Sequence, residues 1–176
     1  MERAGAARVL VAGIGNVFAG DDGFGPEVAR RLAASPVPDG VRVVDYGIRG
    51  LHLAYDLLDG YQALVLVDAL PGAGPPGEVV VLEVGPEHLG TGNLDAHGMD
   101  PVAVLASLEG LGGQLPRTFV VGCTPVDVAE GIGLSSVVQH AVEVATGTVR
   151  ALVHDLLEDQ PSAGPAAVAT TAPREA

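Results

Sequence analysis

Short apolar runs alternate with segments of helical periodicity along most of the chain. The apolar runs are typical of buried strands, and they cover residues 7–15, 41–47, 63–70, 78–84 and 117–125. Apolar residues recur at helical spacing in residues 25–35, 51–60, 100–113 and 134–159. Strands that alternate with helices predict the α/β class. We therefore expect a three-layer sandwich, in which helices cover both faces of a twisted, mostly parallel five-stranded sheet.

Capping residues define the ends of several predicted helices. Pro26 suits the first turn of a helix, where its missing N–H is not needed. Asp100 is placed to cap the third helix, and Gly112 follows its end. Either Ser135 or Ser136 is expected to cap the last and longest helix.

The length of 176 residues suggests one domain followed by a tail. We expect a single α/β domain to occupy residues 1–159. Residues 160–176 are rich in Pro, Ala, Ser and Thr and offer little to bury, which predicts a disordered tail. The connection formed by residues 85–99 is glycine-rich and longer than most connections in compact domains, which hints at a functional loop.

Charge and composition exclude several classes of function. All nine basic residues are Arg and face 22 acidic residues, so the net charge is −13. Such a chain is not expected to bind nucleic acid or an anionic membrane, because both attract cationic side chains. The absence of Lys also excludes Schiff-base chemistry and a Walker A phosphate loop.

The sequence further predicts a cytoplasmic protein. Its single cysteine, Cys123, permits no intrachain disulfide and is compatible with a reducing compartment. No apolar run reaches the length of a membrane span. The apolar segment near the N-terminus is short and interrupted by glycine, unlike a secretory signal peptide.

The stretch VAGIGNVFAGDDGFG begins like a loop that cradles a phosphate. Gly13 and Gly15 fit the dinucleotide pattern G-x-G-x-x-G, but Phe18 takes the place of its third glycine. Asp21 and Asp22 follow, and a carboxylate about 4 Å from a phosphate would repel it by roughly 1 kcal/mol per charge pair in water. The loop is therefore better suited to a cation.

Two aspartates are expected at the same edge of the sheet. Asp22 follows the first strand and Asp68 ends the third, and ligands gather at the carboxyl ends of parallel strands. With His97 from the long connection, they would form a three-ligand metal site with positions open for water. Two alternatives stay open at this point: Asp21 or Asp22 caps the first helix, and His97 is an ordinary loop residue.

The remaining candidate side chains have structural interpretations. His52, His140 and His154 fall within predicted helices, and His88 is flanked by loop residues. Cys123 follows a strand and has no recognisable base as a partner, so we expect a small buried residue. No G-x-S-x-G motif occurs, and no Ser, Thr or Cys nucleophile with a base stands out.

Four ordered stretches resemble the hydrogenase maturation endopeptidases, the proteases that finish the large subunit of nickel–iron hydrogenases. They are GIGNVFAGDDGFG, LVLVDAL, DAHGMDPVAVLASL and VVGCTPVDVAEGIGLS, and they run from about Val9 to the last helix. The resemblance implies an α/β sandwich that removes a C-terminal peptide from the large-subunit precursor once nickel is installed. It also implies that the metal ligands are Asp22, Asp68 and His97.

The implied partner is the large-subunit precursor, and the implied metal is nickel that the precursor itself carries. Another divalent metal could occupy these ligands in the isolated protein, which we expect to be a monomer. Either the metal polarises the scissile carbonyl or activates a water, or it only docks the substrate while Asp22 or Asp68 activates the water. The alternatives are a nickel-binding maturation chaperone without hydrolysis and a small-molecule phosphorylase or nucleotide-binding domain.

One loop departs from the family's pattern. Similar proteins often carry Asp-Gly-Gly-Thr after the second strand, where this chain has Asp45, Tyr46, Gly47 and Ile48. Because this loop lies beside the expected cleft, the resemblance does not extend to which hydrogenase is recognised. Arg49 follows, and it either contacts the substrate peptide or is an exposed residue before a helix.

Overall fold

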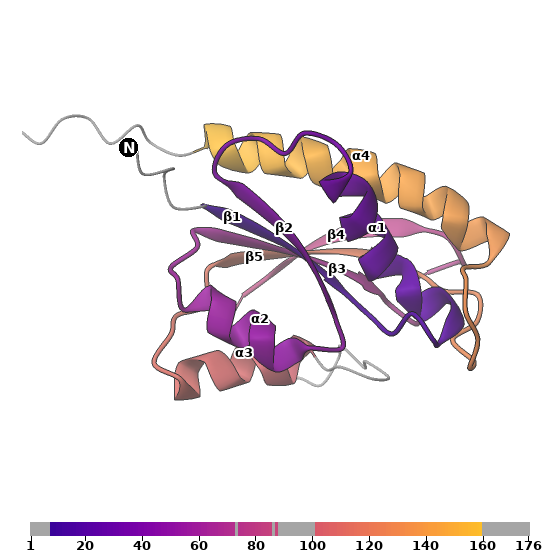
Figure 1. Cartoon of the computed structure of the whole chain (residues 1–176), viewed down its shortest axis with the longest axis horizontal. Helices are drawn as coiled ribbons and strands as arrows, with labels where there is room; N and C mark the ends of the chain where they lie inside the picture. Colours follow the sequence, from indigo (N-terminus) through magenta and orange to yellow (C-terminus); the bar gives the residue numbers. More distant parts are fainter. Residues whose placement is uncertain (1–7, 73, 86, 88–100, 160–176) are drawn as a thin grey trace, which may run out of the picture.

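The computed structural model describes residues 8–72, 74–85, 87 and 101–159. A five-stranded sheet runs through the middle of this part of the chain (Figure 1), in the order β2-β1-β3-β5-β4. Its strands are β1 (Val9–Ile14), β2 (Val41–Gly47), β3 (Ala63–Ala69), β4 (Val79–Val84) and β5 (Arg117–Cys123). Neighbouring strands pair in parallel except β4, which pairs antiparallel with β5. The prediction of a mostly parallel five-stranded sheet is confirmed.

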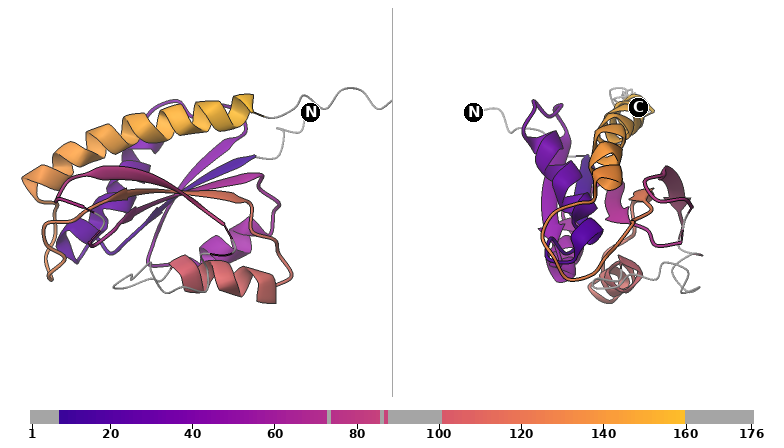
Figure 2. Two further views of the ribbon diagram at one scale, coloured as in Figure 1. Left: turned by 180° about the vertical axis from the view of Figure 1, so that it is seen from behind. Right: turned by 90° about the vertical axis from the view of Figure 1, so that its right-hand side faces the viewer.

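Helices cover both faces of this sheet, as Figures 1 and 2 show. The four α-helices of the described ranges are α1 (Phe24–Ala33), α2 (Gly50–Leu57), α3 (Pro101–Gly110) and α4 (Ser136–Glu158). Successive side chains of a strand point to opposite faces, so Val9 and Val11 of β1 join the core under α1 and α4. Leu10 and Ala12 join the core that contains residues of α2 and α3. The predicted three-layer sandwich is therefore confirmed.

The caps predicted from the sequence are confirmed at some helix ends and not at others. Ser135 caps α4 by accepting a hydrogen bond from the backbone N–H of Val138 at 3.4 Å, and Gly112 lies beyond α3 with a φ of 82°. At α1 the cap residue is Gly23, with no hydrogen bond from a side chain. The alternative in which one of the two aspartates caps this helix is therefore wrong.

A short 3-10 helix that the sequence pattern did not predict, η1 (Gly20–Gly23), leads directly into α1. The first turn of α1 lies close to the carboxyl ends of two strands. A side chain at Gly25 would collide with the carbonyl oxygens of Ile14 at the end of β1 and Val67 in β3. This close approach places η1 beside the edge where the parallel strands end.

No helix within the described ranges is long and apolar enough to cross a membrane. Several predictions from the sequence fall outside these ranges. They are most of the connection 85–99, with His88 and His97, the cap at Asp100 and the tail formed by residues 160–176.

Candidate active site

Asp68 lies near the end of β3, a strand whose residues are all buried. Asp68 is only 5% exposed. Burial raises the pKa of Asp68 well above its ordinary value, and the negative charge of Asp22 raises it further. A hydrogen bond with the backbone of Ala69 acts in the opposite direction. The two carboxylates therefore lie close enough to interact, as the order of the parallel strands predicts.

The loop between β1 and η1 fixes the position of Asp22. The backbone N–H of Asn16 donates to Oδ2 of Asp22 at 2.8 Å. Gly15 has a φ of 142°, and a side chain there would overlap the carbonyl oxygen of Asp22. Glycine therefore allows the loop to pass directly over the residue that carries the candidate ligand.

Asp21, the preceding residue, has a different environment and is only 1% exposed. Its carboxylate accepts hydrogen bonds from the backbone N–H groups of Val126 at 2.9 Å, Asp127 at 3.2 Å and Ser135 at 2.6 Å. The Ser135 hydroxyl donates a fourth hydrogen bond at 2.9 Å. Asp21 thus connects η1 to the segment that leads into α4.

The end of β2 carries the loop that departs from the family pattern. Oδ1 of Asp45 accepts a hydrogen bond from the N–H of Gly47 at 2.9 Å. The guanidinium of Arg49 donates to the backbone carbonyl oxygens of Asp45 and Tyr46. Arg49, the residue that directly precedes α2, is therefore held against the end of β2.

The comparison with known proteins decides the family. Residues 26–151 match the family model HycI, described as hydrogenase maturation protease. The chain belongs to this family. The hydrogenase expression/formation protein HupD of Rhodobacter capsulatus is 33% identical over 126 residues, which span 70% of this chain and 60% of that protein. The phosphorylase and nucleotide-binding alternatives are thereby excluded.

Two further relatives are matched over most of their length. The hydrogenase 2 maturation protease of Escherichia coli is 28% identical over 152 residues, which span 84% of this chain and 92% of that one. The solved structure of the hydrogenase maturating endopeptidase HybD from E. coli superposes with a TM-score of 0.74 at 27% identity. That superposition covers 85% of this chain and 93% of the other, so the fold is shared over nearly its whole extent.

The three predicted metal ligands differ in whether the family model and the structure cover them. Asp68 and His97 fall inside the residues that match the family model, whereas Asp22 lies just before they begin. The described ranges hold no group of three or more His, Cys, Asp or Glu side chains that could bind a metal ion. Asp22 and Asp68 supply carboxylate oxygens that suit a divalent cation, since a bound cation would relieve their mutual repulsion. His97 would have to complete the set.

Other side chains of the protease take structural positions. Cys123 is fully buried, and burial raises the pKa of its thiol to about 11, with the charge of Asp21 as a second cause. A thiol with that pKa is protonated at neutral pH and is a poor nucleophile. His52 lies in α2, and His140 and His154 lie in α4, as the sequence predicts.

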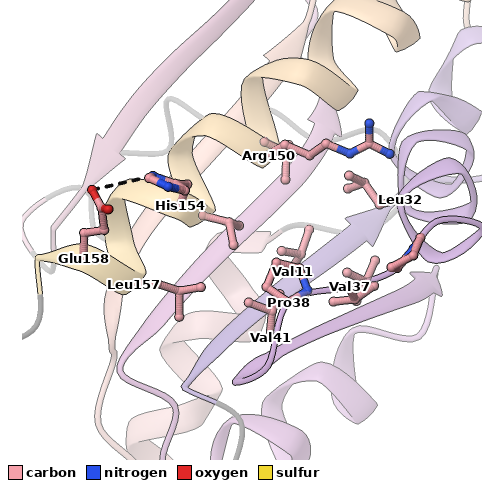
Figure 3. Close-up of a pocket in the computed structure, with 13 residues that line it drawn as sticks. Val11, Leu32, Val37, Pro38, Val41, Arg150, His154, Leu157 and Glu158 are labelled. Atoms are coloured by element: carbon pink, nitrogen blue, oxygen red, sulfur yellow. Dashed lines mark ion pairs between the residues drawn. The ribbon is translucent and has the colours of Figure 1, made fainter.

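A cavity of about 450 Å³ lies between α4 and the segment that joins α1 to β2 (Figure 3), and neither Asp22 nor Asp68 is among the residues that line it. Apolar side chains such as Leu32 and Val37 line it, and Val41, at the start of β2, places it toward the amino ends of the strands. At its rim His154 lies 3.7 Å from Glu158. Neither the location nor the lining suits hydrolysis, so the candidate active site is the edge that carries Asp22 and Asp68.

Proposed function

We propose that this protein is the endopeptidase that removes the C-terminal peptide of a nickel–iron hydrogenase large-subunit precursor after nickel insertion. One observation carries the proposal: a buried Asp68 interacts with Asp22 at the carboxyl edge of the sheet, in a chain that belongs to the hydrogenase maturation proteases. Burying a carboxylate in an otherwise apolar strand is unfavourable, which supports a functional reason for it.

The proposed ligand set explains why the nickel would come with the substrate. Asp22, Asp68 and His97 offer two oxygens and one nitrogen but no thiolate, so by themselves they would hold nickel weakly. Nickel held by the precursor can accept them as additional ligands. Docking in this way would place the C-terminal segment of the precursor beside the sheet edge, and proximity would lower the barrier to hydrolysis.

The chain's own residues would then position the reactants and move protons. Asp22, held by the N–H of Asn16, keeps its carboxylate oriented toward the substrate metal. Burial and the charge of Asp22 raise the pKa of Asp68, which makes its carboxylate a stronger base toward an attacking water than an ordinary aspartate. The proposal also includes a cytoplasmic location, with which the single cysteine, Cys123, is compatible, and a monomer.

The test is incubation of the protein with large-subunit precursor prepared with and without nickel, followed by mass spectrometry of the precursor's C-terminus. We expect loss of a C-terminal peptide only from the nickel-loaded precursor. Equal cleavage of the nickel-free precursor would overturn nickel recognition. Binding of the nickel-loaded precursor without any cleavage would instead favour a nickel-binding maturation chaperone.

A further inference from the structure

Two consecutive carboxylates at the sheet edge lie in opposite environments. Asp22 is partly exposed and interacts with Asp68, whereas Asp21 is almost fully buried and accepts four hydrogen bonds. A carboxylate with this many donors is a strong, charge-assisted anchor.

The donors to Asp21 come from a segment that is distant in the sequence. They belong to Val126, Asp127 and Ser135, which are separated from Asp21 by 105 to 114 positions. Ser135 is also the residue that caps α4. Asp21 therefore joins η1 to the beginning of a 23-residue helix that packs into the core.

Backbone hydrogen bonds join the same two segments at Asp21 and just before it. The N–H of Gly20 donates to the carbonyl oxygen of Gly131 at 2.9 Å, and the N–H of Gly131 donates to that of Phe18 at 2.8 Å. The N–H of Asp21 donates to the carbonyl oxygen of Asp127 at 2.9 Å. A side chain at Gly20 would approach that same oxygen to 2.8 Å, so the two segments are in close contact.

We propose that Asp21 is a positioning residue, which holds η1 against residues 126–135 and thereby directs Asp22 toward Asp68. Asn16 and Gly15 fix Asp22 from the amino-terminal side of the loop, and Asp21 fixes it from within η1. Rotation of η1 would change the separation of the two candidate ligands without altering either of them. The catalytic consequence rests on the proposed function, whereas the anchoring contacts are independent of it.

The informative substitution is Asp21→Asn, which keeps the shape but replaces a carboxylate oxygen with an amino group. That group would face N–H donors, so the anchor would lose acceptors that its partners need. We expect kcat/KM for the nickel-loaded precursor to fall about 10- to 100-fold, as for a misplacement of about 1 Å. The affinity of the isolated protein for Ni²⁺, measured by calorimetry, should fall as well.

A matched control separates positioning from general stability. Val153→Ala removes buried apolar volume in α4, in a residue that lines the cavity. It should lower the melting temperature and leave kcat and Ni²⁺ affinity unchanged. If Asp21→Asn lowers only the melting temperature, as Val153→Ala does, the positioning role is overturned.

Two variants of Ser135 decide the question if Asp21→Asn does not fold. Ser135→Ala removes one donor to Asp21 and should reduce kcat and Ni²⁺ affinity, whereas Ser135→Thr keeps the hydroxyl and should restore both. Identical values for these two variants would overturn the inference. Failure of the proposed function gives a different result, because wild-type protein would then release no peptide from the nickel-loaded precursor. If the wild type cleaves and Asp22→Asn is defective while Asp21→Asn and Ser135→Ala cleave like the wild type, the inference about Asp21 fails alone.

Discussion

The sheet has one edge where the parallel strands end and another where they begin, which are called here the carboxyl edge and the amino edge. The two edges differ in the side chains that they bury. The carboxyl edge buries two carboxylates, those of Asp21 and Asp68, while the amino edge is closed by apolar side chains such as Val41 around a cavity. Burying charge opposes folding, and burying apolar surface favours it. Residues proposed for catalysis therefore lie at the carboxyl edge, and residues that only stabilise the fold lie at the amino edge. Substitutions at the carboxyl edge should reduce cleavage of the precursor, whereas substitutions at the amino edge should reduce stability alone.

The largest effect is expected at the carboxyl edge from Asp68→Asn. The amide keeps the size of the side chain but can neither carry the negative charge nor exchange a proton. If Asp68 takes part in proton transfer, cleavage of nickel-loaded precursor should fall about 10²- to 10⁴-fold. The rate of peptide release, with circular dichroism to show that the fold is retained, measures this. A variant with the wild-type rate would remove Asp68 from the site.

Gly25→Ala should damage both stability and chemistry, because a methyl group there collides with the carbonyl oxygens of Ile14 and Val67. Overpacking of this kind costs about 1–3 kcal/mol in the free energy of unfolding. The matched control is Gly147→Ala in α4, where a side chain would meet no atom within 4 Å. That control should gain about 0.5–1 kcal/mol from lower backbone entropy in the unfolded chain. Denaturant titration of both variants measures the two free energies of unfolding. Equal values for the two variants would contradict this prediction.

Val153→Ala should affect stability alone, because Val153 is buried beside the cavity at the amino edge. Loss of two buried methyl groups, at about 0.8 kcal/mol each, lowers the free energy of unfolding by about 1.6 kcal/mol. For a chain of this size the melting temperature should fall by about 3–6 °C. A parallel loss of precursor cleavage would show that the two edges are not independent.

The smallest effect concerns stability against pH at Asp68. Folding raises the pKa of Asp68, so the folded state favours the protonated form, and the ionised form destabilises the fold as pH rises above the unfolded-state pKa. Asp68→Asn should therefore be more stable than the wild type at neutral pH in the presence of a chelator. The difference should disappear in acid. Thermal unfolding at several pH values measures it, and a difference that grows in acid would have the wrong sign.

The sequence predicts this fold well because its signals are local. Ala63–Ala69 is apolar on both faces, as in the centre of a parallel sheet, and its Asp68 therefore had to lie at the carboxyl edge. Asp22 follows the neighbouring strand β1 and meets it there. The cap at Ser135 was equally visible, since a hydroxyl stood directly before a long helical pattern.

The role of Asp21 could not be predicted from the same signals. An Asp-Asp-Gly stretch before a helix favours a local cap, yet the partners of Asp21 lie more than 100 positions away. Only the assembled fold brings these donors to one buried carboxylate. The short helix η1 escaped prediction because four residues carry no measurable periodicity. His97 lies outside the described residues, so its part in the site stays a prediction.

The most direct test of nickel-dependent cleavage at the carboxyl edge is a single-turnover reaction with nickel-loaded large-subunit precursor. Wild type, Asp22→Asn and Val153→Ala should be compared at equal concentration and well below their melting temperatures, with peptide release followed by mass spectrometry. We expect equal rates for the wild type and Val153→Ala and no detectable release by Asp22→Asn. Full activity of Asp22→Asn would contradict the assignment of this edge as the active site.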